Sequence, residues 1–326
     1  MRVLISGATG FVGRSLVRSL IDSNCRVISI VRESQFNLPE QVVQVTVSDL
    51  ENWSDTNLSF KNNFKKILID VDVVIHLAAR AHLLVDKSND PLAKFREINT
   101  DATVIFANLA AEAGVNRFIY LSSIGVNGNK SSQPFTEQDD PKPHNAYAIS
   151  KHEAENGLLA LAKESKMQVV IIRPPLVYGP NAPGNFATLI KWIYKGVPLP
   201  FGAIDNQRSF VALENLISFI IYCIDHPKAA NEVFLISDGE DVSTTELLRK
   251  VAKALGKKPW LIPIPMIWMI FAAKLVGKNN IASQLFGSLQ VDSTKARAVL
   301  GWKPVITMDE QLKITADAYL ENEKNL

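Results

Sequence analysis

The sequence predicts a doubly wound α/β fold, in which helices cover both faces of a parallel sheet, together with a smaller second α/β domain. Short apolar runs rich in β-branched residues alternate with helical patterns through the first half of the chain. The 326 residues, of which 47% are hydrophobic and 21% charged, correspond to about two ordinary globular domains. This composition excludes a disordered or fibrous protein.

Each strand and helix follows from a local pattern. Strands are expected at Val3–Ser6, Arg26–Val31, Val42–Val45, Val73–Leu77, Phe118–Ser122, Val169–Arg173 and Val233–Ser237, which are brief and nearly continuous in apolar character. Helices are expected at Val12–Asp22, from Asp90-Pro91 to about Ala113, and at Leu213–Ile224. The segment 178–184 is rich in Pro, Gly and Asn and predicts a loop. Strands that alternate with helices in this way predict a doubly wound sheet.

Charge and hydropathy exclude several classes of partner. The net charge of +2 provides no broad positive field for nucleic acid or for an anionic membrane. The apolar start of the chain is too short for a signal peptide, so we expect a cytoplasmic protein. The stretch Trp260–Val276 is interrupted by two prolines and a lysine, so we expect no integral membrane insertion. It is predicted to form a loop and a core-facing helix, with a membrane-surface helix as the alternative.

A glycine-rich loop joins the first strand to the first helix. Its residues, predicted to bind a dinucleotide, are Gly7, Thr9, Gly10, Phe11, Val12 and Gly13, in the sequence GATGFVG. The first glycine permits a tight turn, the second lets the backbone approach a pyrophosphate, and the third allows close helix packing. Free N–H groups at the helix start attract the phosphates. The loop therefore predicts a Rossmann-type dinucleotide-binding domain.

The end of the second strand favours one cofactor. NAD sites usually place an acidic residue there, whereas this strand is followed by Arg32, with Glu33 one position later. A guanidinium fork suits a 2′-phosphate, so NADP(H) is favoured and NAD(H) is the alternative. Asp49 is a candidate contact to the adenine amino group.

A tyrosine and a lysine are spaced for catalysis. Tyr147 and Lys151 stand four residues apart and share one face of a predicted helix. An ammonium beside a phenol favours the phenolate and lowers the pKa of the tyrosine. Ser122 and Ser123 end an earlier strand, where a hydroxyl can hold a substrate oxygen. The five histidines form no ligand-spaced pair with cysteine or carboxylate partners, so no metal site is expected.

These motifs resemble the extended short-chain dehydrogenase/reductase family, also called the NAD-dependent epimerase/dehydratase family, along the whole chain. The motifs that carry the resemblance are Gly7–Gly13, Asp49-Leu50, His76–Ala79, Asn99-Thr100, Ser122-Ser123, Tyr147–Lys151, Arg173-Pro174, Gln207–Val211 and Leu300–Pro304. The resemblance implies that Ser123, Tyr147 and Lys151 are catalytic. It implies cofactor contacts from Leu50, Leu77, Ala78, Ala79, Asn99, Tyr147, Lys151 and Pro174.

The same resemblance implies a nucleotide-diphosphate sugar, most simply UDP-linked, as substrate. Its contacts are expected from Arg80, His82, Ser123, Asn185 and Arg208. The substrate would lie between a Rossmann domain (1–177 and 211–236) and a nucleotide-sugar-binding domain (178–210 and 237–326). Family analogy also implies a homodimer formed through helices at about 91–113 and 146–162.

Departures from the family's epimerase pattern favour a reductase. Arg32 replaces an acidic residue, Asn127 stands where a tyrosine is common, and segment 283–290 lacks an arginine. The preferred prediction is therefore NADPH-dependent reduction of a UDP-4-keto-6-deoxy-N-acetylhexosamine for surface polysaccharide synthesis. The alternative is a UDP-glucose or UDP-N-acetylglucosamine 4-epimerase that uses the same residues. A non-catalytic dinucleotide-binding regulator is the remote alternative.

Overall fold

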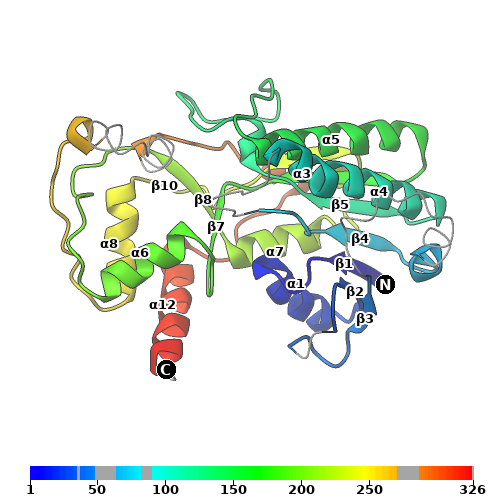
Figure 1. Cartoon of the computed structure of the whole chain (residues 1–326), viewed down its shortest axis with the longest axis horizontal. Coiled ribbons are helices and arrows are strands. Elements are labelled where there is room, and N and C mark those ends of the chain that lie inside the picture. Colours follow the sequence, from blue (N-terminus) through cyan, green and yellow to red (C-terminus); the bar gives the residue numbers. More distant parts are fainter. Residues whose placement is uncertain (35–36, 48–63, 82–89, 270–285, 325–326) are drawn as a thin grey trace.

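The computed structural model describes residues 1–34, 37–47, 64–81, 90–269 and 286–324, and they form a large parallel sheet with a smaller sheet beside it (Figure 1). All seven strands of the large sheet run parallel. In spatial order they are β3 (Val43–Thr46), β2 (Arg26–Val31), β1 (Arg2–Ser6), β4 (Val73–His76), β5 (Arg117–Leu121), β6 (Gln168–Arg173) and β9 (Glu232–Leu235). This order confirms the predicted Rossmann-type fold, because the strands proceed outward from β1 in both directions.

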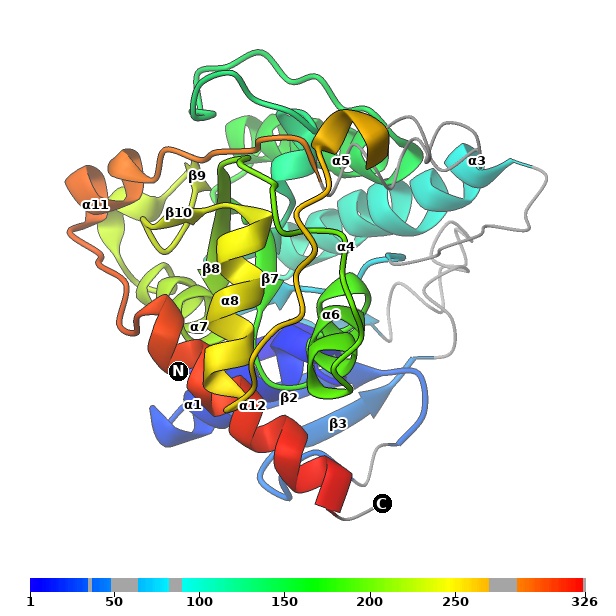
Figure 2. The ribbon, with the colours of Figure 1, turned by 90° about the vertical axis from the view of Figure 1, so that its left-hand side faces the viewer.

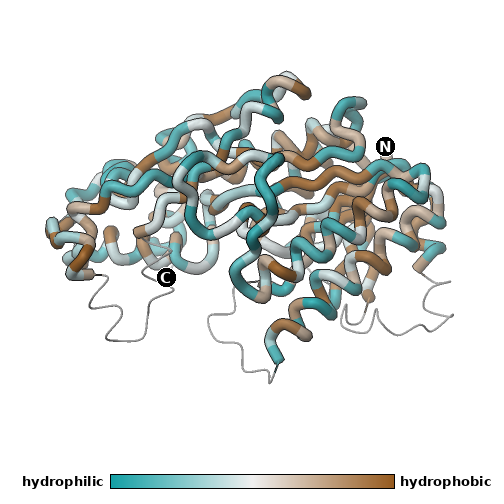
Figure 3. The backbone as a smooth tube through the Cα atoms, turned by 90° about the horizontal axis from the view of Figure 1, so that it is seen from above, coloured by the Kyte–Doolittle hydropathy of each residue, from teal (hydrophilic) through white to brown (hydrophobic). Residues whose placement is uncertain are grey.

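Helices bury both faces of this sheet, which explains why its inner strands are largely apolar. On one face lie α1 (Phe11–Asp22) and α7 (Leu213–Tyr222), and on the other lie α4 (Ala102–Glu112) and α5 (Ala146–Glu164). Each face has its own hydrophobic cluster. Successive β1 residues divide between the two, with Val3 in one cluster and Leu4 in the other. The most hydrophobic backbone segments in Figure 3 lie in this sheet and its helices.

The helix predicted between Pro91 and Ala113 is present but contains a wider turn. It begins as α3 (Pro91–Arg96), capped by the Asp90 carboxylate, which accepts a hydrogen bond from the Ala93 amide at 3.0 Å. A π-helical turn, η2 (Glu97–Asp101), separates α3 from α4. Beyond α4, Gly114 adopts φ +84° as the predicted helix stop.

The smaller sheet consists of three short strands. β8 (Arg208–Ala212) lies between β7 (Leu176–Tyr178), which is parallel to it, and β10 (Asp241–Val242), which is antiparallel. Three helices share a separate hydrophobic cluster with these strands: α6 (Asn185–Tyr194), α8 (Thr244–Ala254) and α12 (Met308–Lys324). Figure 1 shows this second body to the left of the large sheet.

One late segment packs on the large sheet. α11 (Thr294–Leu300) and Trp302 belong to the same cluster as α1 and α7, and the Trp302 ring lies 5.0 Å from that of Phe219. The segment falls within 237–326, which the sequence assigns to the nucleotide-sugar-binding domain. The division into two domains therefore stays a prediction, and this segment is its first point to test.

In the part of the chain that the structure describes, we find no helix both long enough and apolar enough to span a membrane. The described part of Trp260–Val276 ends at Met269. Met269 is buried, and the partly buried Leu261 and Ile264 pack against the same hydrophobic cluster, so the described part faces the core in part. The other large side chains are exposed: Trp260, Ile262, Met266, Ile267 and Trp268. Residues 270–276 lie outside the described residues.

Candidate active site

The glycine-rich loop lies at the carboxyl end of β1, against the residues that follow β4. Gly7 adopts φ +79°, and a Cβ there would lie 2.7 Å from the Ala78 backbone nitrogen. A Cβ at Gly13 would lie 2.7 Å from the Ala8 Cα. Both positions therefore require glycine, for backbone conformation at the first and for close packing at both. This geometry is the one that the sequence motif predicts.

The start of α1 suits the phosphates of a dinucleotide. Gly10 is the N-cap residue, no side chain caps the helix, and its first turn contains no acidic residue. The first amide groups of a helix have no partner within the helix, and the helix dipole makes this end positive. The predicted residues Thr9, Phe11 and Val12 lie at this turn, so a dinucleotide pyrophosphate fits the site.

Asn99 holds the neighbouring backbone in place from the π-helical turn. Its Oδ1 accepts a hydrogen bond from the Arg80 amide at 2.8 Å, and its Nδ2 lies 3.1 Å from both the Arg80 carbonyl and the Ser150 Oγ. A single side chain therefore joins α5 to the segment after β4, which contains Leu77, Ala78 and Ala79. We interpret the π-helical turn as the local change that aims Asn99 at both elements.

Tyr147 and Lys151 lie on the inner face of α5. The helix is capped by Asn145, whose side chain accepts a hydrogen bond from the Ala148 amide at 2.8 Å. The Lys151 Nζ lies 6.0 Å from the centre of the Tyr147 ring and 4.4 Å from that of Tyr120. It donates a hydrogen bond to the Leu121 carbonyl at 2.8 Å. The predicted pair is thus anchored to the end of β5.

Burial dominates the acid–base properties of this pair. It raises the pKa of Tyr147 to about 12 and lowers the pKa of Lys151 to about 7. The sequence predicts a lowered tyrosine pKa, but the shift in the structure has the opposite direction because Tyr147 is buried, and the Lys151 ammonium is directed to the Leu121 carbonyl. Tyr147 therefore needs a further positive charge nearby before it can act as a base near neutral pH.

A cavity of about 260 Å³ brings together four of the predicted site residues from distant parts of the chain. These are Ser123, Tyr147, Asn185 and Arg208. Ser123 follows β5, and its Oγ accepts a hydrogen bond from the Gly125 amide at 3.1 Å. The buried Pro174 accepts a hydrogen bond from the Ile124 amide at 2.9 Å, which fixes this turn at the end of β6. The cavity thus has hydroxyl groups at one wall.

A second wall of the cavity is suited to an anion. Asn185 is the first residue of α6, whose start has no side-chain cap and no acidic residue in its first turn. Thr244 at the start of α8 also lines the cavity, but its amide donates to the Asn206 Oδ1 at 2.8 Å and Glu246 lies in that first turn. Arg208 on β8 adds a guanidinium group, whose Nη1 donates to the Gly287 carbonyl at 2.8 Å. Burial lowers the pKa of Arg208, but an arginine remains charged at neutral pH. This wall offers charge-assisted bonds to a diphosphate.

Other predicted site residues are placed elsewhere. Arg32 is exposed just after β2, and it lies apart from the residues that line the cavity. The Arg80 guanidinium carbon lies 5.7 Å from the centre of the Phe95 ring, which is itself 6.2 Å from the Tyr147 ring. Predicted contacts at Asp49, Leu50 and His82 lie outside the described residues.

No local pattern in the sequence signals the buried ion pair behind the site. Glu155 on α5 accepts hydrogen bonds from Arg173 at 3.0 and 2.6 Å, and Arg173 also donates to Asn127 at 2.9 Å. Burial alone would raise the pKa of Glu155, but contacts with His152 and Arg173 outweigh it and lower the pKa. The partners are 18 residues apart, on a helix and a strand, so only the fold brings them together. Thr244 also lines the cavity but is not among the predicted site residues, although the capping box Ser243–Glu246 marks its helix start.

Metal-ligating side chains do not converge in the described ranges. Across residues 1–34, 37–47, 64–81, 90–269 and 286–324, no three His, Cys, Asp or Glu side chains are grouped to hold a metal ion. His76 has other partners. Its two ring nitrogens lie 2.5 Å from the Ser6 Oγ and 2.9 Å from the Thr103 Oγ1, and burial lowers its pKa to about 3.

The fold and the site define an enzyme class, a Rossmann-fold protein with a serine, a tyrosine and a lysine beside a dinucleotide loop. Residues 3–237 match the model of the NAD dependent epimerase/dehydratase family. The chain therefore belongs to this family and is an enzyme, as the sequence motifs predict.

Known proteins with different activities are similar to nearly the whole chain. A UDP-glucose 4-epimerase of Vibrio cholerae is 47% identical over 323 residues, which cover 98% of this chain and 95% of that protein. A dTDP-4-dehydro-6-deoxyglucose reductase of Escherichia coli is 24% identical over 94% of each chain. Among solved structures, a UDP-glucose 4-epimerase with UDP-glucose from Thermotoga maritima has a TM-score of 0.79 at 24% identity, and the match covers 99% of this chain and 100% of that one.

Proposed function

We propose that this protein is an NAD-dependent 4-epimerase of a UDP-hexose. The observation that carries the proposal is the cavity in which Ser123 and Tyr147 face the same space as Arg208 and Asn185. Hydroxyl groups at one wall and anion-binding groups at another match a sugar joined to a diphosphate. The similarity to UDP-glucose 4-epimerases supports the same substrate class.

The choice between epimerase and reductase rests on similarity. The reductase that the sequence analysis preferred is supported by the Escherichia coli relative at 24% identity, whereas the epimerase is supported by the Vibrio cholerae relative at 47%. The alternative prediction is therefore favoured over the preferred one. Segment 283–290 lacks the family's arginine, and Asn127 stands where a tyrosine is common. These departures at single positions carry less weight than identity along the whole chain.

The proposed roles follow from position. Tyr147 takes the proton of the sugar C4 hydroxyl and later returns a proton to the same oxygen. Ser123 donates a hydrogen bond to that oxygen while it is a carbonyl. Lys151 holds the inner face of α5 against the end of β5 and adds positive charge near Tyr147. Arg208 and Asn185 hold the diphosphate, so that the sugar can turn over between the two proton transfers.

The cofactor site is proposed from the loop geometry. Gly7, Gly10 and Gly13 would hold the pyrophosphate, and the segment that follows β4 would line the other side. When bound, NAD supplies a hydride acceptor and donor and a positive ring charge that favours the Tyr147 phenolate.

A direct test separates the two reactions. Purified protein is incubated with UDP-glucose and with UDP-N-acetylglucosamine without added cofactor, and with a UDP-4-keto-6-deoxy-N-acetylhexosamine plus NADPH. We expect interconversion of C4 epimers without any net consumption of a reductant. Stoichiometric NADPH oxidation with no epimer formed would instead establish the reductase. Tyr147→Phe is the control that removes either activity.

Arg32 favours NADP(H) as the cofactor, which a binding experiment tests. Its guanidinium group is exposed at the end of β2, where it suits a 2′-phosphate. The family description favours NAD instead. Binding of NAD and NADP is measured for the wild type and for Arg32→Ala. If the wild type prefers NADP and Arg32→Ala loses that preference, the reductase is supported. If the wild type binds NADP no more tightly than NAD, and Arg32→Ala leaves both affinities unchanged, the NADP(H) prediction fails.

The remaining predictions are assembly and location. We propose a homodimer through the helices of residues 91–113 and 146–162, which light scattering of the purified protein tests. The two-domain division and the cytoplasmic location rest on sequence and family analogy. Fractionation of cells that produce the tagged protein tests the location.

A further inference from the structure

A group of large apolar side chains is exposed on the smaller body of the protein. Its members, with their exposed fractions, are Val197 (37%), Trp260 (62%), Ile262 (40%), Met266 (40%), Ile267 (73%) and Trp268 (64%). We call these residues the 260–268 surface. Such a group is costly in water and marks an interaction site more often than a single exposed residue does.

Backbone pairing holds the parts of this surface together. The Leu199 amide donates to the Trp260 carbonyl, and the Ile262 amide donates to the Leu199 carbonyl, both at 2.8 Å. The Gly202 amide donates to the Ile262 carbonyl at 3.0 Å. Figure 2 looks onto this side of the molecule, where the segment after α8 runs in front, between α8 and α6. The surface is therefore built on two paired segments of the fold.

Positive charge predominates around this surface, although Lys253 pairs with Asp309 at 3.7 Å and the exposed Asp205 directly follows residue 204. Segments 186–204 and 253–269 contain five lysines and no aspartate or glutamate. Lys195, Lys257 and Lys258 are exposed, and the Lys257 Nζ lies 5.2 Å from the centre of the Tyr194 ring at the end of α6. Beyond Tyr194 lies α12, whose last turns carry Glu321 and Glu323, so the positive region is bounded on that side.

We propose that the 260–268 surface docks the protein peripherally on an anionic lipid membrane. Tryptophan is favoured at the boundary between head groups and acyl chains, because its ring is apolar and its N–H is polar. Lysines beside such rings are attracted to the negative surface of the leaflet within a Debye length. A net charge of +2 is too small for a broad field, but this attraction needs only local charge.

The charge favours a membrane over a second copy of the chain. Two copies joined through this surface would bring like charges at Lys195, Lys257 and Lys258 toward one another, which opposes association. An anionic membrane instead matches both the apolar centre and the positive border. The surface also leaves the active site open, since none of its six residues lines the cavity around Tyr147.

The proposal is tested with the full-length protein by vesicle sedimentation. One set of vesicles contains equal parts of phosphatidylcholine and phosphatidylglycerol, and the other contains phosphatidylcholine alone. We expect binding to the anionic vesicles, which weakens as salt is added. Lys257→Gln/Lys258→Gln should weaken this binding about fivefold per lysine, or about thirtyfold for the pair. Trp260→Ser/Trp268→Ser should weaken it as well, with 4-epimerase activity unchanged.

Matched controls alter equally exposed residues elsewhere. Lys166→Gln/Lys228→Gln makes the same charge change, and Val43→Ser/Ile69→Ser removes exposed apolar side chains far from this surface. Both controls should bind vesicles as the wild type does. The proposal is overturned by no binding, by equal binding to both kinds of vesicle, or by equal losses in the controls. Dimers in the absence of lipid that dissociate in the tryptophan variant would also overturn it.

Discussion

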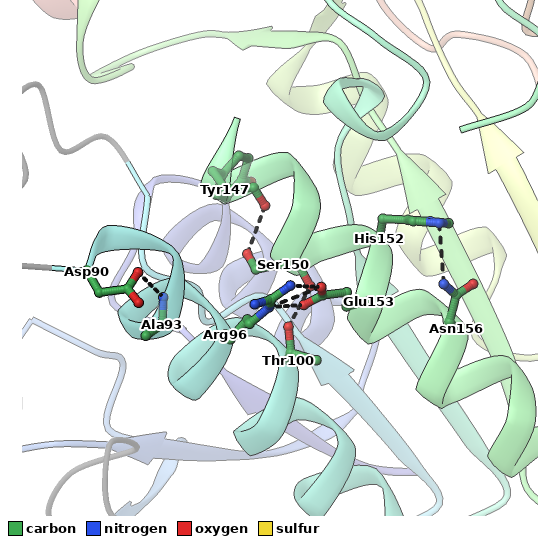
Figure 4. Close-up of polar contacts among 9 residues, drawn as sticks. All are labelled: Asp90, Ala93, Arg96, Thr100, Tyr147, Ser150, His152, Glu153 and Asn156. Carbon is green, nitrogen blue, oxygen red and sulfur yellow. Dashed lines mark hydrogen bonds and ion pairs between the residues drawn. The ribbon is translucent and has the colours of Figure 1, made fainter. Parts of the chain in front are cut away.

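The two faces of α5 place charged groups in opposite environments. On the outer face, Glu153 pairs with Arg96 of α3 (Figure 4), with a shortest distance of 2.6 Å, and both side chains are partly exposed. On the inner face, one helical turn beyond Lys151, Glu155 pairs with Arg173 at the same distance while almost completely buried. The geometry of the two pairs is similar, and only the surroundings differ.

The exposed outer pair only links two helices, whereas burial on the inner face controls the acid–base groups. Around the outer pair, water screens the charges, so the ion pair adds little beyond a link between α3 and α5. The inner pair is almost completely buried, so each charge depends on its partner. The same burial shifts the pKa values of Tyr147 and Lys151 in opposite directions. The acid–base properties of the side chains on α5 therefore depend on how far each side chain is buried.

The largest effect is expected for Tyr147→Phe on the inner face. Removal of the phenol oxygen removes the proposed proton carrier, so kcat should fall about 100- to 10,000-fold. The ring remains against Phe95, so the melting temperature should stay near that of the wild type. Epimer formation by coupled assay gives kcat, and calorimetry gives the melting temperature. Retention of more than a tenth of the wild-type kcat would remove Tyr147 from the mechanism.

Glu155→Gln should have the largest effect on stability. It leaves the buried Arg173 guanidinium without its counter-charge, which costs about 3–5 kcal/mol of unfolding free energy. Urea unfolding at neutral pH measures this loss. The matched control is Glu153→Gln on the outer face, for which we expect a much smaller change.

A double variant separates the effect of the unpaired Arg173 charge from the effect of packing. Glu155→Gln/Arg173→Met removes both members of the inner pair, and it should recover part of the stability that Glu155→Gln loses. No recovery in the double variant would mean that packing, rather than the unpaired charge, accounts for the loss.

Lys151 should make stability depend on pH. Its pKa is about 7 in the folded protein and near 10.5 when unfolded, so between these values the unfolded chain binds more protons. The free energy of unfolding therefore rises with pH in this window, by up to about 1.4 kcal/mol per pH unit. Lys151→Met should lack this contribution, which urea unfolding of both proteins at pH 7 and at pH 9 measures. Parallel pH profiles would show that the lysine pKa is not lowered.

The smallest effect is expected for Arg96→Ala on the outer face. The Arg96 side chain is partly exposed, so the urea midpoint should stay close to that of the wild type. Hydrogen exchange in α3 should become faster, because the link to α5 is lost. A loss of stability as large as that of Glu155→Gln would contradict the contrast between the two faces.

Local patterns predict much of this fold. The central residues of β1 and β6 are apolar because both faces of the sheet are covered, and this leaves a clear mark in the sequence. Gly7 and Tyr147 were also predicted in their structural context, since the loop and the helix face depend on near neighbours. The π-helical turn at Asn99 was not predicted, because the contacts of Asn99 with Arg80 and Ser150 span 19 and 51 residues.

The sequence by itself determined the sheet, the glycine loop and the spacing of Tyr147 and Lys151, because each depends on residues close together in the chain. Tertiary structure alone decided the cavity that joins Ser123 to Arg208 and the burial that gives Lys151 a pKa of about 7. It also decided that Glu155 is buried with Arg173 while Glu153 is exposed with Arg96. Desolvation depends on every segment that packs around a group, and those segments come from the whole chain.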